Sequence, residues 1–123
     1  MNAHSQARRA YSATAAPTRT ARGVEYEAMA RVTHRLRGAA RNGGPGFGAL
    51  AAALHDNRRL WCLFAADVAQ SANLLPADLR ARIFYLAEFT QQHSRKVLAG
   101  EGGVDPLLEI NTAVMRGLRG GEA

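Results

Sequence analysis

The chain has 123 residues, of which 47% are hydrophobic, and it carries one cysteine and a formal net charge of +6. That length suits one domain with a single modest core, and the lone Cys62 excludes disulfide bonds within the chain. No apolar run approaches the roughly 18 residues of a membrane span, and the N-terminal end lacks the hydrophobic segment of a secretory signal. We therefore expect a soluble cytoplasmic protein with no membrane partner.

Four amphipathic helices are predicted, because helix-forming residues dominate and no alternating strand pattern occurs. Residues 1–17 are predicted to form a flexible basic N-terminal arm, and residues 18–123 a single domain. The helices should begin at Thr18 or Thr20, Phe47, Pro76 and Pro106, with Asp105 as the cap of the last. They should end at Arg41, Gln70, Ala99 and the pair Gly120-Gly121, with Gly100 as a left-handed stop. Short connections, of which residues 42–46 should be the most flexible, favour an all-α helical bundle.

The spacing of apolar residues predicts which face of each helix is buried. The second helix has the widest stripe and should be central, with Leu60 and Leu63 widening one flank. Cys62, among large apolar neighbours, is expected to be a small core residue. The four predicted inner faces, in chain order, are Met29, Val32, Leu36 and Ala39; Phe47, Leu50, Leu54, Asn57, Trp61, Phe64 and Val68; Leu79, Ile83, Leu86, Thr90, His93 and Val97; and Leu107, Leu108, Ile110, Val114, Met115 and Leu118.

The positive charge is concentrated in the first third of the chain. Eight arginines up to Arg41 are opposed there only by Glu25 and Glu27, whereas the remainder is electrically balanced. Such asymmetry indicates either a solvated arm with an arginine-coated helix or a surface that binds RNA or DNA. We favour the solvated surface, because the arm lacks the interleaved aromatic residues of a base-stacking platform. The arginines are Arg8, Arg9, Arg19, Arg22, Arg31, Arg35, Arg37 and Arg41.

No catalytic, cofactor or metal site is expected. The four histidines lack metal-ligand spacing, and Gly43-Gly44-Pro45-Gly46 lacks the lysine and the strand of a phosphate-binding loop. Polar residues within apolar stripes are more informative. Asn57, Thr90 and His93 interrupt such stripes, and Asn111 borders one.

These polar residues have two interpretations. They form a buried network that fixes helix register, which we favour for Thr90 and His93. Alternatively, part of this surface is an open groove for an amphipathic partner helix, with Trp61 and Phe64 as anchors and Asn57 or Arg58 as polar contacts. For Asn57 both interpretations stay open.

Residues 53–61, Ala-Leu-His-Asp-Asn-Arg-Arg-Leu-Trp, carry a family resemblance together with Ala65-Ala66-Asp67-Val68-Ala69. Further matching pieces are Leu75-Pro76-Ala77-Asp78-Leu79-Arg80, residues 83–89 with His93, and residues 100–118 with Asp105-Pro106-Leu107. The chain resembles the flagellar biosynthesis regulator FlaF of alphaproteobacteria over about residues 18–119. Its most specific piece is the run from Asn57 to Trp61.

The resemblance implies a non-enzymatic cytoplasmic protein that promotes flagellin synthesis and secretion. Its partners would be flagellin, which it would bind as a chaperone does, and the repressor FlbT, with flagellin mRNA affected only indirectly. Asn57, Arg58 and Trp61 are the predicted partner contacts, and Asp67 and Glu88 are weaker candidates. The alternative is a small RNA- or DNA-binding regulator that uses the arginine-rich N-terminal region.

Overall fold

The computed structural model describes residues 17–41, 44–70 and 75–122, with side chains described for residues 26–41, 44–70 and 75–118. Four helices fill most of these ranges, which contain no strand: α2 (Pro17–Ala40), α3 (Phe47–Val68), α4 (Ala77–Leu98) and α5 (Asp105–Glu122). The predicted all-α bundle is confirmed. Residues 1–16 of the predicted arm (residues 1–17) lie outside the described residues, whereas Pro17 is the first residue of α2. Residues 42–43 of the loop expected to be flexible and residues 71–74 also lie outside them.

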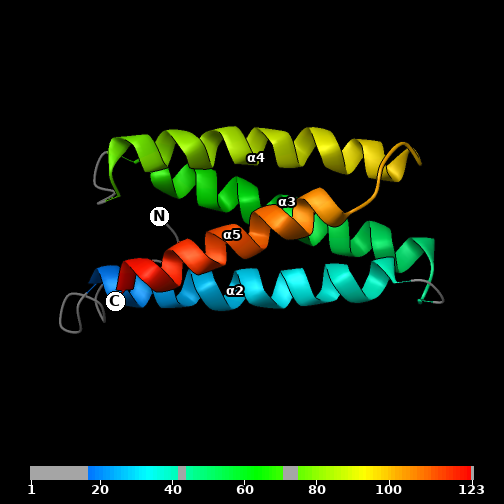
Figure 1. Ribbon diagram of the computed structural model, residues 1–123, viewed down its shortest axis with the longest axis horizontal. Coiled ribbons are helices and arrows are strands. Elements are labelled where there is room, and N and C mark those ends of the chain that lie inside the picture. The colour runs from blue at the N-terminus through cyan, green and yellow to red at the C-terminus, as the bar shows by residue number, and fades with distance from the viewer. Residues whose placement is uncertain (1–16, 42–43, 71–74, 123) are drawn as a thin grey trace.

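Successive helices run in opposite directions along the bundle (Figure 1). α3 packs against α2 on one side and α4 on the other, and α5 packs mainly against α2. α4 contacts α5 only sparsely and does not contact α2 within the described residues. Each helix therefore contacts two others, and α4 packs mainly against α3.

The helix boundaries differ from the predicted ones in small ways that have local causes. Pro76 is the N-cap of α4 and not its first helical residue, because its carbonyl accepts the first helical hydrogen bond, from the amide of Arg80 at 3.0 Å. The carbonyl of Val104 accepts in the same way from Leu108 at 3.0 Å, so Asp105 is helical and is not the cap. α5 also continues through Gly120 and Gly121 to Glu122. Glycine costs a helix only about 1 kcal/mol, so it does not by itself end one.

Gly100 ends α4 as predicted. Its φ of +76° is left-handed, and its amide donates to the carbonyl of Val97 at 3.1 Å. The amide of Glu101 donates to the carbonyl of Lys96 at 2.8 Å. These two hydrogen bonds form a Schellman motif, which satisfies carbonyls that the helix end would otherwise leave unpaired.

A layer of buried polar side chains divides the hydrophobic core into two clusters. One cluster lies toward the α4 N-terminus and the other toward the α4 C-terminus, and each helix contributes at least one polar residue between them. The first cluster contains Met29, Trp61, Phe64, Val68, Ile83, Ala87 and Leu118, and the second contains Leu36, Ala53, Leu54, Val97, Val104 and Leu107. The polar layer contains Thr33, Asn57, Thr90, Ser94 and Asn111, each at most 1% exposed.

Asn111 is the centre of this layer. Its Oδ1 accepts from Trp61 Nε1 at 2.9 Å, and its Nδ2 donates to Asn57 Oδ1 at 2.8 Å and to Thr33 Oγ1 at 3.0 Å. The Thr33 hydroxyl in turn donates to the carbonyl of Met29 at 2.6 Å. One amide thus joins α2, α3 and α5. The network interpretation is confirmed for Asn57, and Asn111 lies inside its stripe and does not merely border it.

The polar side chains that α4 contributes to this layer, Thr90 and Ser94, do not hydrogen-bond to the other helices. Thr90 is fully buried, yet its hydroxyl has no hydrogen-bond partner within the described residues. The Ser94 hydroxyl donates to the carbonyl of Thr90, on its own helix, at 2.7 Å. His93 is only half-buried and its Nε2 donates to the carbonyl of Gly103 at 2.8 Å. α4 therefore faces the polar layer without bonding across it.

Three predicted core residues of α3 are exposed, and these predictions were wrong. Phe47 is 63% exposed because it begins α3, at an end of the bundle where α2 has already stopped. Leu63 is 60% exposed because it lies on a side of α3 that no described helix covers, and Cys62 is exposed although Gln91 of α4 donates to its Sγ. The buried stripe of α3 is therefore narrower than its apolar sequence suggests.

Replacing the centre of the network should destabilise the whole bundle. Asn111→Ala leaves Trp61 Nε1 without a buried partner, so we expect the free energy of unfolding to fall by about 2–4 kcal/mol. Urea denaturation measures this change. Thr112→Ala on the neighbouring, half-buried residue is the control and should change stability by no more than about 0.5 kcal/mol. Equal losses in the two variants would contradict the role of Asn111.

Candidate partner-binding groove

An apolar hollow of about 440 Å³ lies between the N-terminal half of α4 and the C-terminal half of α5. Arg82 is the one charged side chain that lines it within the described residues. α4 and α5 diverge toward this end of the bundle (Figure 1). We call this hollow the α4–α5 groove; it is lined by Phe64, Leu75, Pro76, Leu79, Arg82, Ile83, Leu86, Ala113, Val114, Gly117 and Leu118.

The divergence of α4 and α5 explains why the groove exists. Leu79 and Ile83 lie one turn apart on the same face of α4, yet Ile83 is buried while Leu79 stays 38% exposed. On the facing wall, Gly117 has no side chain, and a Cβ added there would meet nothing within 4 Å. Phe64 of α3 lines the hollow while it is only 4% exposed. The groove is therefore an apolar surface that no described helix covers.

Two of the five predicted contact residues are inside the core. Trp61 and Asn57 are both 0% exposed and both are hydrogen-bonded to Asn111. The Trp61 ring also lies 5.7 Å from the ring of Phe64, centroid to centroid, in a tilted arrangement. The structure thus places Trp61 behind the residue that lines the groove. Of the two expected anchors, only Phe64 reaches the groove.

The other three predicted contacts lie outside the groove lining. Arg58 is half-buried, and its Nε donates to Gln91 Oε1 at 3.0 Å across the interface between α3 and α4. Asp67 is half-buried near the C-terminal end of α3, and Glu88 is exposed on α4. The structure does not bring these three together with Trp61 and Asn57 in one surface. Their role as partner contacts stays a prediction.

Gln91 joins α4 to α3 by hydrogen bonds, a role that the sequence did not predict. Besides accepting from Arg58, it donates through Nε2 to the carbonyl of Arg58 at 3.2 Å and to Cys62 Sγ at 3.3 Å. Half-buried Gln91 therefore hydrogen-bonds α4 to α3. A single glutamine on an amphipathic helix gives no sequence signal for this role. Asn111, in contrast, could have been identified, because it interrupts the stripe formed by Leu107 and Val114.

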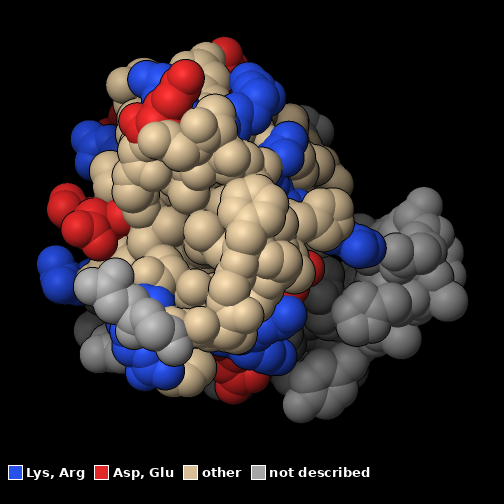
Figure 2. All heavy atoms as spheres, turned by 90° about the vertical axis from the view of Figure 1, so that its right-hand side faces the viewer, with Lys and Arg blue, Asp and Glu red and all other residues tan. Residues whose placement is uncertain are grey.

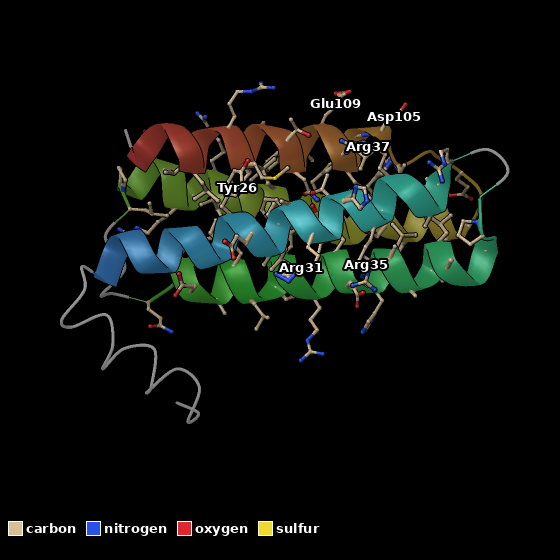
Figure 3. All side chains as sticks on the ribbon, turned by 90° about the horizontal axis from the view of Figure 1, so that it is seen from below. Tyr26, Arg31, Arg35, Arg37, Asp105 and Glu109 are labelled. Carbon is tan, nitrogen blue, oxygen red and sulfur yellow. The ribbon has the colours of Figure 1, made fainter. Side chains whose placement is uncertain are left out.

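The described arginines of α2 do not form one continuous basic surface. Arg31 and Arg35 lie on the α3 side of α2, and Arg37 lies on the α5 side (Figure 3). Arg35 pairs with Asp56 of α3 at 2.7 Å, and Arg37 and Glu109 of α5 line the same shallow hollow. The charge is therefore divided between two sides and partly neutralised. The side chains of the more N-terminal arginines lie outside the described ranges.

A second hollow, of about 530 Å³, lies at the end of the bundle that carries the α2–α3 and α4–α5 connections. That end presents an uncharged centre bordered by charged side chains (Figure 2). Its lining combines apolar residues such as Phe47 and Leu50 with Arg41, Asp105 and four glycines. Because charges and exposed backbone interrupt its apolar surface, it suits an apolar helix face less well than the α4–α5 groove does.

Two further features, a metal site and a membrane-spanning helix, are absent from the described part of the chain. Within it, no three or more His, Cys, Asp or Glu side chains gather where they could hold a metal ion. None of its helices is long and apolar enough to cross a membrane.

The exposure of Cys62 has a direct chemical consequence. We expect its thiol to react with Ellman's reagent in the native protein at a rate close to that in urea, because the side chain is solvent-accessible. Titration of the thiol with and without urea measures the two rates. A native rate many times slower than the denatured rate would show instead that Cys62 is a core residue.

The chain matches the family model described as "Flagellar protein FlaF" over residues 7–118. The match covers all of α2, α3 and α4 and begins within residues 1–17, the predicted arm. No curated protein and no solved structure matches the chain.

Proposed function

Because the chain belongs to the FlaF family of flagellar proteins, we propose that it promotes flagellin production by binding flagellin in the α4–α5 groove. The observation that supports this most strongly is the apolar lining of that groove, in which Leu79 is 38% exposed. An amphipathic helix buries its apolar face in a groove of this kind. The terminal segments of flagellin, which we take to be amphipathic helices, are the proposed occupants.

The proposed mechanism is binding without chemistry. Covering the apolar faces of flagellin's terminal helices would keep them from associating before export. Removing that apolar area from water would supply most of the binding free energy, at roughly 25 cal/mol per Å² before the costs of ordering both partners. Such binding should depend little on salt, in contrast to binding of a nucleic acid.

Regulation would follow from the same contact. We propose that the protein acts in the cytoplasm together with or against a FlbT-like repressor, through competition or a shared complex with flagellin. Flagellin mRNA would then be affected only through that repressor. In this scheme Trp61 and Asn57 act from within the core by holding α5, one of the two helices that frame the groove.

A charge placed in the groove should weaken flagellin binding without unfolding the protein. In Leu79→Asp the carboxylate would lie on a partly exposed groove wall, so we expect the affinity for flagellin to fall by about tenfold or more. Tyr85→Asp is the matched control: Tyr85 is 69% exposed on the same helix and does not line the groove. Fluorescence anisotropy with labelled flagellin helices measures both, and circular dichroism checks the fold.

Two results would contradict the proposal. Equal affinity of the two variants would place flagellin elsewhere on the surface. Capture of RNA at low salt only, with no flagellin retained by the unmodified protein, would instead support the alternative function of the arginine-rich region.

A further inference from the structure

The α4–α5 groove is uncovered within the described residues, although its lining is mostly apolar. Leu79 is 38% exposed there, and Leu86 and Val114 are only partly buried. An apolar surface left open to water costs free energy, at roughly 25 cal/mol per Å². A segment of the same chain can cover such a surface at a lower entropic cost than a second molecule, because it is already tethered nearby. Residues 1–16 are the longest segment outside the described ranges.

The helix that follows this segment begins at the end of the bundle that carries the groove. At that end α2 and α4 begin and α5 ends (Figure 1). Counting residues from the α2–α3 ion pair and the α3–α4 hydrogen bond places Pro17 near the level of Pro76, the N-cap of α4. Helices across the diagonal of such a bundle lie about 14 Å apart, because neighbours pack at 8–10 Å. Six extended residues span about 20 Å, so Tyr11 can reach the groove from Pro17.

The sequence of this segment suits the shape of the groove. Three alanines and a tyrosine recur at steps of three and four residues, which places them on one face of a helix: Ala3, Ala7, Ala10 and Tyr11. Small side chains allow close packing between two walls. On the α5 wall, a Cβ added to Gly117 would meet nothing within 4 Å, so there is open space for them.

Tyr11 also gives the segment a chemically specific contact. It is the only Phe, Tyr or Trp among residues 1–16. Arg82 is the one charged side chain that lines the groove within the described residues. A guanidinium is attracted to the face of an aromatic ring, and the ring itself removes apolar area from water. Arg8 and Arg9 lie outside the face formed by the alanines, so their charges can stay in solvent.

The family match includes part of the same segment. It starts at residue 7, so residues 7–16 belong to the unit that the family shares, together with α2, α3 and α4. Packing of the segment onto the domain accounts for this inclusion, whereas a solvated arm without contacts does not require it.

We propose that residues 3–11 dock in the α4–α5 groove, with the ring of Tyr11 against the guanidinium of Arg82. This inference goes beyond the proposed flagellin binding and does not depend on it. Where both hold, the segment and flagellin compete for one surface, and the groove becomes available to flagellin only when the segment is released.

Nuclear Overhauser effects between the Tyr11 ring and the methyl groups of Leu86 and Val114 test the docking directly, because they arise only between protons that lie close together. The sample is the full chain, without flagellin, with protonated tyrosine rings and protonated leucine and valine methyl groups in a deuterated background. Tyr11→Phe removes the protonated ring and so identifies the cross-peaks that come from this residue.

Two substitutions on α4 separate docking in the groove from contact elsewhere. Leu79→Asp places a carboxylate on the groove wall and should remove the Tyr11 cross-peaks. Tyr85→Asp is the matched control, because Tyr85 is 69% exposed on the same helix and does not line the groove; it should leave those cross-peaks unchanged.

The expected result is a set of cross-peaks from Tyr11 to Leu86 and Val114 that is lost in Leu79→Asp only. Absence of these cross-peaks in the unmodified chain would overturn the docking. Cross-peaks from Tyr11 to exposed Leu63 of α3 in their place would also overturn it, because they would put the segment on another face. Both results leave flagellin binding to its own test.

Discussion

The side-chain amide of Asn111 is the constraint on which the bundle depends. It has few alternatives, because an asparagine at 0% exposure must find partners inside the protein, and it finds them on α2 and α3. Those bonds fix the register of three helices against one another, since a shift by one turn would leave Trp61, Asn57 and Thr33 without partners. Apolar packing alone would tolerate several such shifts. The network thus selects one arrangement of the two hydrophobic clusters that lie on either side of it.

The hydrogen bonds of the same network do not reach α4 within the described residues. α4 contributes Thr90 and Ser94 to the polar layer but bonds to no other helix through them, and its polar links to the rest start at Gln91 and His93. Its N-terminal half forms a wall of the α4–α5 groove. The proposed flagellin binding uses this wall.

Much of the fold could be predicted from the sequence, because the signals involved are local. Apolar spacing located all four helices, Gly100 marked the end of α4, and polar residues such as Asn57 indicated a buried network. The exposure of Cys62 and Leu63 could not be predicted, because an apolar stripe does not show how many neighbours will cover it. The groove was equally inaccessible: Leu79 and Val114 each belong to an ordinary inner face, and only the divergence of two helices turns them into one surface.

Mapping the flagellin contact onto the protein residue by residue tests the central claim most directly. Amide chemical shifts of the isotopically labelled protein, recorded while an unlabelled flagellin terminal helix is added, report which residues sense the partner. The account predicts the largest changes in residues 77–86 of α4 and 113–118 of α5, and smaller changes along the exposed side of α2. Changes concentrated around Arg31 and Arg35, with those two segments unaffected, would contradict it.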